Sequence, residues 1–516
     1  MKRLFSLALA IATAACGGAS EDEGPRPTLS LVTISPDSMV YQPLLGSTPL
    51  QPEVIAASVS RGLVKLDGAG QVVPDMATSW RVSDDGRSII FRLREAAWSD
   101  GRAVKGEDFV RMFRAALAPS SRHPFKNMLK VIENGADIAA GRKPASALGV
   151  SSPIDDAVEI RLDAPRPNFL QLIAQPGLGL SDRNMSKVAL GPFRLTRNAN
   201  NHITLLPNPD FSDPGSIPFG RIDMQAQQDA AMALQRFRVD RADVLMGGTT
   251  GDFQLARAAG LDRFLRLDPV HGVYGYRPLR MDGPLGDVRI RRALAMVIDR
   301  DGIAASTGAA TAQPLVTMLP HGLSELEQPT MPEWASQSPA ERLQAATALM
   351  AEARGKDAAQ PLTLKIALPN GPTHVAILAQ VSAAWRPLGI ILQAVRANDD
   401  SADLGVMDTI TPGDTISWLF DQLSCTDKGY CSKPALELLN EARTARDLPT
   451  RRAMLARLDQ FLTVDQAFIP LITPIRWSMV DAAVLGWTDN PTGQHPLWAL
   501  SRISGQPSAP AAALSR

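Results

Sequence analysis

Hydrophobic and polar positions alternate along two neighbouring stretches near the N-terminal end. Residues 78–82 and 89–93 place apolar side chains at every second position, and Asp84-Asp85-Gly86 lies between them. A period of two indicates strands with one buried face, and an Asp-Asp-Gly run is typical of a turn, so these residues predict a β-hairpin. Apolar residues then follow helical spacing over 109–117, and Pro119 ends that predicted helix.

The second half of the chain predicts helices and strands in alternation. Ser338 and Glu341 have the spacing of a capping box at the start of a predicted helix over 339–354, and Gly355 follows its end. The other predicted elements are a strand at 362–368, a helix at 375–385, a strand at 390–395, and helices at 435–446 and 450–462. A strand–helix–strand order implies parallel pairing with a right-handed crossover, so the pattern predicts an α/β fold.

The N-terminus has the features of an export signal. Lys2 and Arg3 precede an apolar stretch over 4–12, and Thr13-Ala14-Ala15 leads into Cys16. This arrangement resembles a bacterial lipobox, so we expect a lipoprotein signal peptide at 1–15, lipidation of Cys16 and a flexible tether at 16–27. The alternative is a plain signal peptide that happens to contain a cysteine. The expected location is the periplasm or cell surface, with the lipid anchor in a bacterial membrane.

The other two cysteines, Cys425 and Cys431, are close together in the sequence. Disulfides persist in oxidising compartments, so an exported chain is expected to join this pair as a structural staple. The alternative is two buried free thiols.

Composition excludes several classes of protein. The chain has 516 residues, 45% of them hydrophobic, and its 53 basic residues balance 53 acidic ones. This composition supports a large core and gives no reason to expect a nucleic-acid partner. No nucleophile elbow, zinc motif, P-loop or dinucleotide fingerprint is present, and the six histidines are widely scattered. We therefore expect no metal, no cofactor and no catalytic residue.

From Arg61 onward, the order of motifs resembles the family 5 solute-binding proteins of ABC importers, the oligopeptide and dipeptide receptors. The matching segments are Gly62-Leu63, Ser79-Trp80, Val82–Gly86, Phe91–Arg94, Trp98–Gly101, Glu107–Val110, Gly191-Pro192-Phe193, Asn208-Pro209, Asp287-Val288-Arg289, Arg292-Ala293-Leu294, Ile298-Asp299-Arg300, Leu388-Gly389-Ile390 and Phe468–Leu471. The resemblance implies a two-lobed periplasmic-binding-protein type II fold with an extra inserted lobe.

The same resemblance divides the chain into lobes. The expected limits are 28–50, 186–270 and 482–505 for lobe I, 51–185 for the inserted lobe II, 271–481 for lobe III, and 506–516 for a disordered tail. The implied function is capture of peptides or peptide-like solutes between lobes I and III, and their delivery to an ABC permease by a monomeric, non-catalytic receptor. The alternatives are a receptor for a non-peptide solute, or an assembly protein, scavenging lipoprotein or enzyme on the same fold.

The resemblance also indicates where a ligand would bind. In the family, a strand after the lobe III strand–helix–strand unit holds the peptide backbone, and an Asp pairs with its amino terminus. Candidate ligand-binding residues here are Gly405, Met407, Asp408, Thr409, Thr411, Asp414 and Trp418. Thr411 stands where that Asp is expected, so either Asp408 or Asp414 replaces it, or the ligand lacks a free amino terminus. Asp414 also fits the Asp of the following turn in the family.

Two tyrosines complete the candidate site. Tyr274 and Tyr276 are two residues apart, so a strand would place both on one face. They either line the ligand cleft or pack between the lobes.

Overall fold

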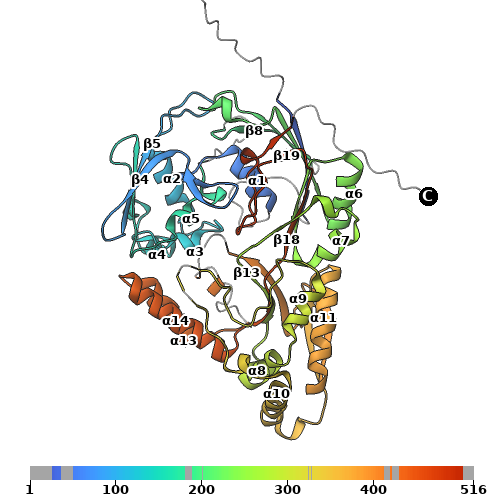
Figure 1. Cartoon of the computed structure of the whole chain (residues 1–516). Coiled ribbons are helices and arrows are strands. Elements are labelled where there is room, and N and C mark those ends of the chain that lie inside the picture. Colours follow the sequence, from blue (N-terminus) through green and yellow to red (C-terminus); the bar gives the residue numbers. More distant parts are fainter. Residues whose placement is uncertain are drawn as a thin grey trace, which may run out of the picture.

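The computed structural model describes residues 26–35, 50–180, 189–199, 202–323, 325–326, 328–411, 416, 419–420 and 429–503. The expected signal peptide (1–15), most of the tether (16–27) and the tail (506–516) lie outside these residues. The described elements form three units, each built around one sheet. In Figure 1 one unit lies at the upper left, one at the upper right and one at the bottom. They are named here after their sheets.

The seven-stranded unit contains the first strand and several later ones. Its order is β12 (Leu265–Asp268), β18 (Arg476–Val480), β11 (Val244–Gly248), β1 (Thr28–Ile34), β10 (Arg221–Gln227), β9 (His202–Pro207) and β8 (Phe193–Ala199). The central strand β1 pairs in parallel with β10 and β11. Apolar side chains of α1 (Leu50–Val59) join the core on one face, and those of α6 (Ala230–Asp240) and α7 (Phe253–Ala258) join the core on the other.

The four-stranded unit is antiparallel and lies at the left of Figure 1. Its strands are β4 (Ala77–Val82), β5 (Ser88–Leu93), β7 (Ala157–Arg161) and β6 (Val150–Ser151), with helices α2 (Gly106–Ala116), α3 (Lys126–Leu129), α4 (Gly135–Ala139) and α5 (Phe169–Ile173) and the small hairpin β2 (Val64–Leu66)–β3 (Val72–Pro74). The pairing of β4 with β5 confirms the hairpin predicted from the alternating pattern, with Gly86 in the left-handed region its turn requires.

The five-stranded unit carries the longest helices. Its strand order is β15 (Ile390–Arg396), β14 (Leu362–Leu368), β16 (Leu404–Ile410), β13 (Gly272–Pro278) and β17 (Ile469–Ile472). One face of this sheet is covered by α8 (Val288–Met296), α9 (Arg300–Thr307), α10 (Pro339–Arg354) and α11 (Pro372–Trp385). The other face is covered by α13 (Lys433–Thr444) and α14 (Leu448–Asp465). β14 and β15 are parallel, which confirms the predicted strand–helix–strand unit. The capping box of α10 is also present, because the Ser338 amide donates to the Glu341 carboxylate at 2.7 Å.

The chain crosses twice between the seven-stranded and five-stranded units, at residues 269–271 and 473–475, the two crossing segments. The expected lobe III extends to Asp481, whereas β18 pairs with β11 and β12 of the seven-stranded unit. The lobe limits themselves stay a prediction. Every residue of β18 after Arg476 is buried, so the sequence pattern alone does not tell which sheet it joins. After β18, the short strands β19 (Val484–Leu485) and β20 (Ser501–Arg502) pair on either side of the 3-10 turn η10 (Leu497–Ala499).

Candidate ligand-binding site

The seven-stranded and five-stranded units contact each other beside the crossing segments. The Ile475 amide donates a hydrogen bond to the Thr250 hydroxyl at 2.9 Å. The Gln254 amide, at the start of α7, donates to the Thr373 hydroxyl at the start of α11 at 3.1 Å. These bonds hold the first turn of α11 against the short 3-10 turn η4 (Thr250–Asp252) of the other unit.

Glycine allows close approach at this contact. A Cβ added to Gly251 would lie 2.4 Å from the Nε2 atom of His374. Gly371 precedes α11 with φ +138°, and a Cβ there would lie 2.6 Å from the Gly251 carbonyl oxygen. Any side chain at either position would therefore push the two units apart.

Both candidate tyrosines point into the interior of the five-stranded unit, and each is 0% exposed. The Tyr274 hydroxyl is 2.8 Å from Nδ1 of His374, and the two rings stack with centroids 5.7 Å apart. Burial raises the pKa of Tyr274 and lowers the pKa of His374, which favours the neutral forms of both groups. Tyr276 packs edge-on against Trp385, and its hydroxyl has no hydrogen-bond partner among the described residues.

Asp408 pairs with an arginine of the other unit. Its carboxylate accepts a hydrogen bond from Nη1 of Arg476 at 2.8 Å, and its carbonyl accepts one from Nη2 at 3.3 Å. The side chains are 15% and 17% exposed respectively, so solvent screens the pair only in part. Asp408 lies directly opposite Tyr274 in the sheet. Partial burial, the largest cause, and the negative charges of Asp229 and Asp408 raise the pKa of the half-buried Asp252.

The other described candidates on or next to β16 make contacts close to this sheet. Met407 is 7% exposed and packs in the core that α13 and α14 cover, and Gly405 packs against Leu279. Thr409 is half-buried, and the hydroxyl of the buried Thr411 donates to the His271 carbonyl at 3.3 Å.

Several candidates cannot be placed. Asp414, Trp418, Cys16 and Cys425 lie outside the described residues. Cys431 is disulfide-bonded. Its pairing with Cys425 remains a prediction, because Cys425 lies outside the described residues.

Within the described residues, β14 pairs with one edge of β16 at only two positions. The Thr411 amide donates to His271 and the Leu279 amide to Asp403, so odd-numbered residues of β16 turn their main-chain groups towards β13. The even-numbered residues face β14, which pairs with β16 at Leu404 and Gly405 within the described residues. Beyond that point, the side chain of Arg476 occupies the edge at the Asp408 carbonyl. An edge of this kind can accept an added extended segment.

The four-stranded unit contacts the five-stranded unit at a separate place. Arg166 donates to the carbonyl of Arg443 in the last turn of α13 and to the Asp163 carboxylate. Burial, the largest cause, and the nearby Arg451 lower the pKa of Arg166 to about 10. A cation is favourable at a helix C-terminus, so this contact stabilises the three-unit arrangement seen in Figure 1.

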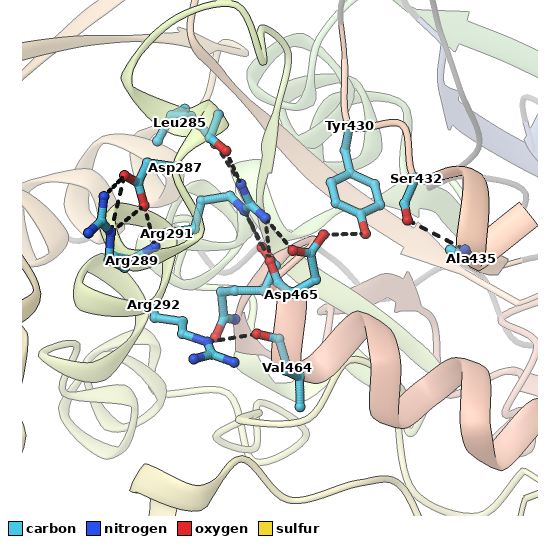
Figure 2. Close-up of polar contacts among 12 residues, drawn as sticks. Leu285, Asp287, Arg289, Arg291, Arg292, Tyr430, Ser432, Ala435, Val464 and Asp465 are labelled. Carbon is cyan, nitrogen blue, oxygen red and sulfur yellow. Dashed lines mark hydrogen bonds and ion pairs between the residues drawn. The ribbon is translucent and has the colours of Figure 1, made fainter. Parts of the chain in front are cut away.

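The Asp287–Arg292 motif has a structural explanation, which Figure 2 shows. Asp287 caps α8 by accepting from the Arg289 amide at 2.8 Å. Arg291, 2% exposed, donates from Nη2 to the Asp465 carboxylate at 2.9 Å, and the Tyr430 hydroxyl donates to the same carboxylate at 2.7 Å. The motif therefore joins the start of α8 to the end of α14, and its hydrogen bonds reach none of the candidate ligand-binding residues that the structure describes.

A cavity lies between α1, β2 and the C-terminal segment, enclosing about 590 Å³ with open solvent included. Glu53 lines it, and burial raises the pKa of this carboxyl to about 8. No ion pair or hydrogen bond of the Glu53 carboxyl is found among the described residues.

Replacing Glu53 with glutamine should make the chain more stable than wild type at pH 9 and leave it nearly unchanged at pH 5. The folded chain keeps the Glu53 proton until about pH 8, whereas the unfolded chain loses it near 4.5. Stability therefore falls as pH rises through this window, and the variant should gain about 1–3 kcal/mol at the upper end. Urea unfolding across pH 5–9 measures the difference. The exposed Glu437→Gln control should show no such trend, and parallel curves for wild type and Glu53→Gln would contradict the prediction.

Neither a metal site nor a membrane-crossing helix was found in the part of the chain that the structure describes. Its His, Cys, Asp and Glu side chains form no group of three that could hold an ion, and none of its helices is long and apolar enough for a bilayer.

Sequence reasoning missed His374, Arg476 and Gly251. The histidines are widely scattered in the sequence and suggested no site, yet His374 is 4% exposed and its ring contacts the Tyr274 hydroxyl. The i, i+2 tyrosine pair was a signal for a buried polar partner, because a buried hydroxyl usually needs one. No sequence signal indicates that Arg476 reaches Asp408.

Comparisons with known proteins agree with this geometry. The family model described as "Bacterial extracellular solute-binding proteins, family 5 Middle" matches residues 71–413. The chain is 26% identical over 476 residues to the periplasmic oligopeptide-binding protein OppA of Salmonella typhimurium, covering 86% of each chain. It is 28% identical over 450 residues to the probable deoxycholate-binding periplasmic protein YgiS of Escherichia coli, covering 81% of this chain and 83% of YgiS.

The crystal structure of Haemophilus influenzae OppA in complex with RPPGFSPFR superposes with a TM-score of 0.79 at 20% identity, covering 93% of this chain and 99% of the other. The expected periplasmic-binding-protein type II fold is thus confirmed. The family model spans well over half of the chain, and the protein belongs to the family 5 bacterial extracellular solute-binding proteins.

Proposed function

We propose that the protein is a lipid-anchored extracytoplasmic receptor of an ABC importer, which captures peptides or peptide-like solutes and delivers them to a membrane permease. The observation that carries this proposal is the junction of the seven-stranded and five-stranded units, where two crossing segments lie beside a strand edge of β16 that β14 pairs, within the described residues, only at Leu404 and Gly405. Relatives named as periplasmic oligopeptide-binding proteins support it. The anchor is the lipidated Cys16, and the receptor acts as a monomer without catalytic activity.

Binding and signalling are the same event in this proposal. An extended ligand adds main-chain hydrogen bonds along β16 and is enclosed as the two units rotate about the crossing segments. Only the closed form completes the ligand's contacts, so binding shifts the population towards it. A shift from 1:99 to 99:1 needs about 5.5 kcal/mol of differential affinity, which full enclosure of a ligand can supply. The permease then recognises the closed conformation of the receptor.

Native mass spectrometry of purified residues 28–516, before and after mild denaturation, tests the proposal. Co-purifying masses that form a peptide ladder are the expected result, because main-chain recognition tolerates many side chains. A single non-peptide mass would contradict it.

The ion pair of Asp408 favours a second candidate, a receptor for a non-peptide solute. Arg476 already occupies the Asp408 carboxylate, so this carboxylate is not available to a ligand ammonium group without loss of the pair. A buried Thr411 offers a hydroxyl, which can hydrogen-bond an ammonium group but not neutralise it. The relative YgiS is named as probably deoxycholate-binding, so deoxycholate is a suitable probe. Saturable deoxycholate binding without binding of trialanine would favour this candidate.

A further inference from the structure

A second cavity lies at the junction of the seven-stranded unit, the four-stranded unit and the C-terminal turn η10. It encloses about 980 Å³ with open solvent included, and it is called the basic pocket here. Its charged lining residues are Arg61, Lys65, Asp75, Arg94 and Asp213. It shares a wall with the cavity of Glu53, but none of the candidate ligand-binding residues on β13 and β16 lines it.

In the part of the chain that the structure describes, only Arg61 of the three cations is paired with a carboxylate. Arg61 donates from Nε to the Asp75 carboxylate at 2.7 Å and from Nη1 to the Ser212 hydroxyl at 3.1 Å. The second oxygen of Asp75 accepts from the Gly62 amide at 2.9 Å. Both side chains of this pair are nearly fully buried, and both carboxylate oxygens of Asp75 accept hydrogen bonds.

Lys65 has no ion pair or hydrogen bond among the described residues. Its ammonium nitrogen lies 3.4 Å from the centroid of the Trp498 ring, which is a cation–π contact. That contact stabilises the charge without neutralising it. Burial, the main cause, together with the nearby Arg61 and Arg94, lowers the pKa of Lys65.

Arg94 is the second cation for which the described residues supply no counter-ion. Its Nε atom is buried and has no hydrogen-bond acceptor among them, although a guanidinium group carries five donors. Burial and the charge of Arg61 lower the pKa of Arg94 as well. Asp213 is the only other carboxylate in the lining, which leaves the basic pocket with a net charge of +1 from Arg61, Lys65 and Arg94 against Asp75 and Asp213. A buried donor without an acceptor is unfavourable, and an anion would supply the acceptor.

We propose that the basic pocket is a second binding site, which holds an anionic oxygen group, a carboxylate or a phosphate, between Lys65 and Arg94. The guanidinium offers a planar fork of donors and the ammonium a compact charge, the combination that binds such oxyanions. The lining comes from two units, Ser212 and Asp213 on one side and Lys65 and Arg94 on the other, so an occupant would also join them. This site acts independently of the proposed transport function.

Calorimetric titration of the full mature protein with inorganic phosphate, and separately with acetate, tests the proposal. Wild type should bind at least one anion saturably, and the double variant Lys65→Gln/Arg94→Gln should bind it at least tenfold more weakly. Asp213→Asn should bind about threefold more tightly, because it removes one of the two negative charges of the lining. Lys356→Gln and Arg386→Gln remove matched exposed charges elsewhere and should leave the affinity unchanged. Comparison of phosphate with acetate decides which anion is preferred.

A crystal of the wild-type protein soaked in selenate gives a second measurement that no variant's folding affects. An anomalous peak between Lys65 and Arg94 is expected. The proposal is overturned if neither anion binds saturably, if the double variant binds as well as wild type, or if the selenate peak is absent from the pocket.

Discussion

Replacing Arg291 with methionine is expected to lower the free energy of unfolding by about 3–5 kcal/mol. Arg291 is 2% exposed and donates to the Asp465 carboxylate at 2.9 Å, to the Leu285 carbonyl at 2.8 Å and to the Gln466 carbonyl at 3.2 Å. Methionine fills part of the space but leaves these acceptors and one carboxylate without their donor. An unsatisfied buried group costs more than the hydrogen bond itself contributes.

The neighbouring Arg292 provides the control for this prediction. It is partly exposed and donates to the Val464 carbonyl at 2.7 Å, so Arg292→Met should lower the free energy by less than about 1 kcal/mol. Urea unfolding followed by circular dichroism measures both variants, and Figure 2 shows both side chains with their partners. Similar losses for the two variants would mean that the buried arginine network contributes little.

Local features of the fold could be predicted because a few neighbouring residues determine them. The hairpin of β4 and β5 follows from a period of two around a turn that ends in Gly86, and α10 follows from the Ser338–Glu341 capping box. The parallel pairing of β14 with β15 follows from their order around α11. In each case the spacing of residues already specifies the hydrogen bonds.

Side-chain partners far apart in the sequence could not be predicted. Asp408 and Arg476 are 68 positions apart, Tyr274 and His374 are 100 apart, and Arg166 reaches the carbonyl of Arg443 across 277 positions. The family resemblance indicated which strand holds the candidate site but not which charges its neighbours bring. The sheet that β18 joins could not be predicted either, since a strand whose residues after Arg476 are all buried fits either sheet equally well.

Asp408→Asn and Arg476→Gln are each expected to lower the free energy of unfolding by about 2–3 kcal/mol, and the double variant should lose little more than either single one. Removing one partner leaves the other charge mostly buried and unpaired, because the side chains are only 15% and 17% exposed. The double variant removes both charges, so the two losses should overlap by a coupling energy of about 1–3 kcal/mol. Urea unfolding of wild type and the three variants measures the cycle.

An exposed pair within the four-stranded unit gives the matched control. Arg92 and Asp156 are 2.8 Å apart but 57% and 54% exposed, so their coupling energy should stay below about 0.5–1 kcal/mol. Strictly additive losses for Asp408 and Arg476 would mean that the pair does not tie the two units together.

The same variants decide what Asp408 does when a ligand binds. If Arg476 holds the carboxylate in the complex as well, Asp408→Asn and Arg476→Gln should change the affinity for trialanine and for N-acetyl-trialanine by similar factors, because each variant acts through the arrangement of the two units. If Asp408 instead turns to the ligand's ammonium group, Asp408→Asn should weaken trialanine by more than tenfold, about 1.4 kcal/mol, and leave the acetylated peptide unchanged. Arg476→Gln would then free the carboxylate and strengthen trialanine binding. Only the second role predicts that Arg476→Gln strengthens trialanine binding relative to binding of the acetylated peptide, so this single comparison separates the two roles.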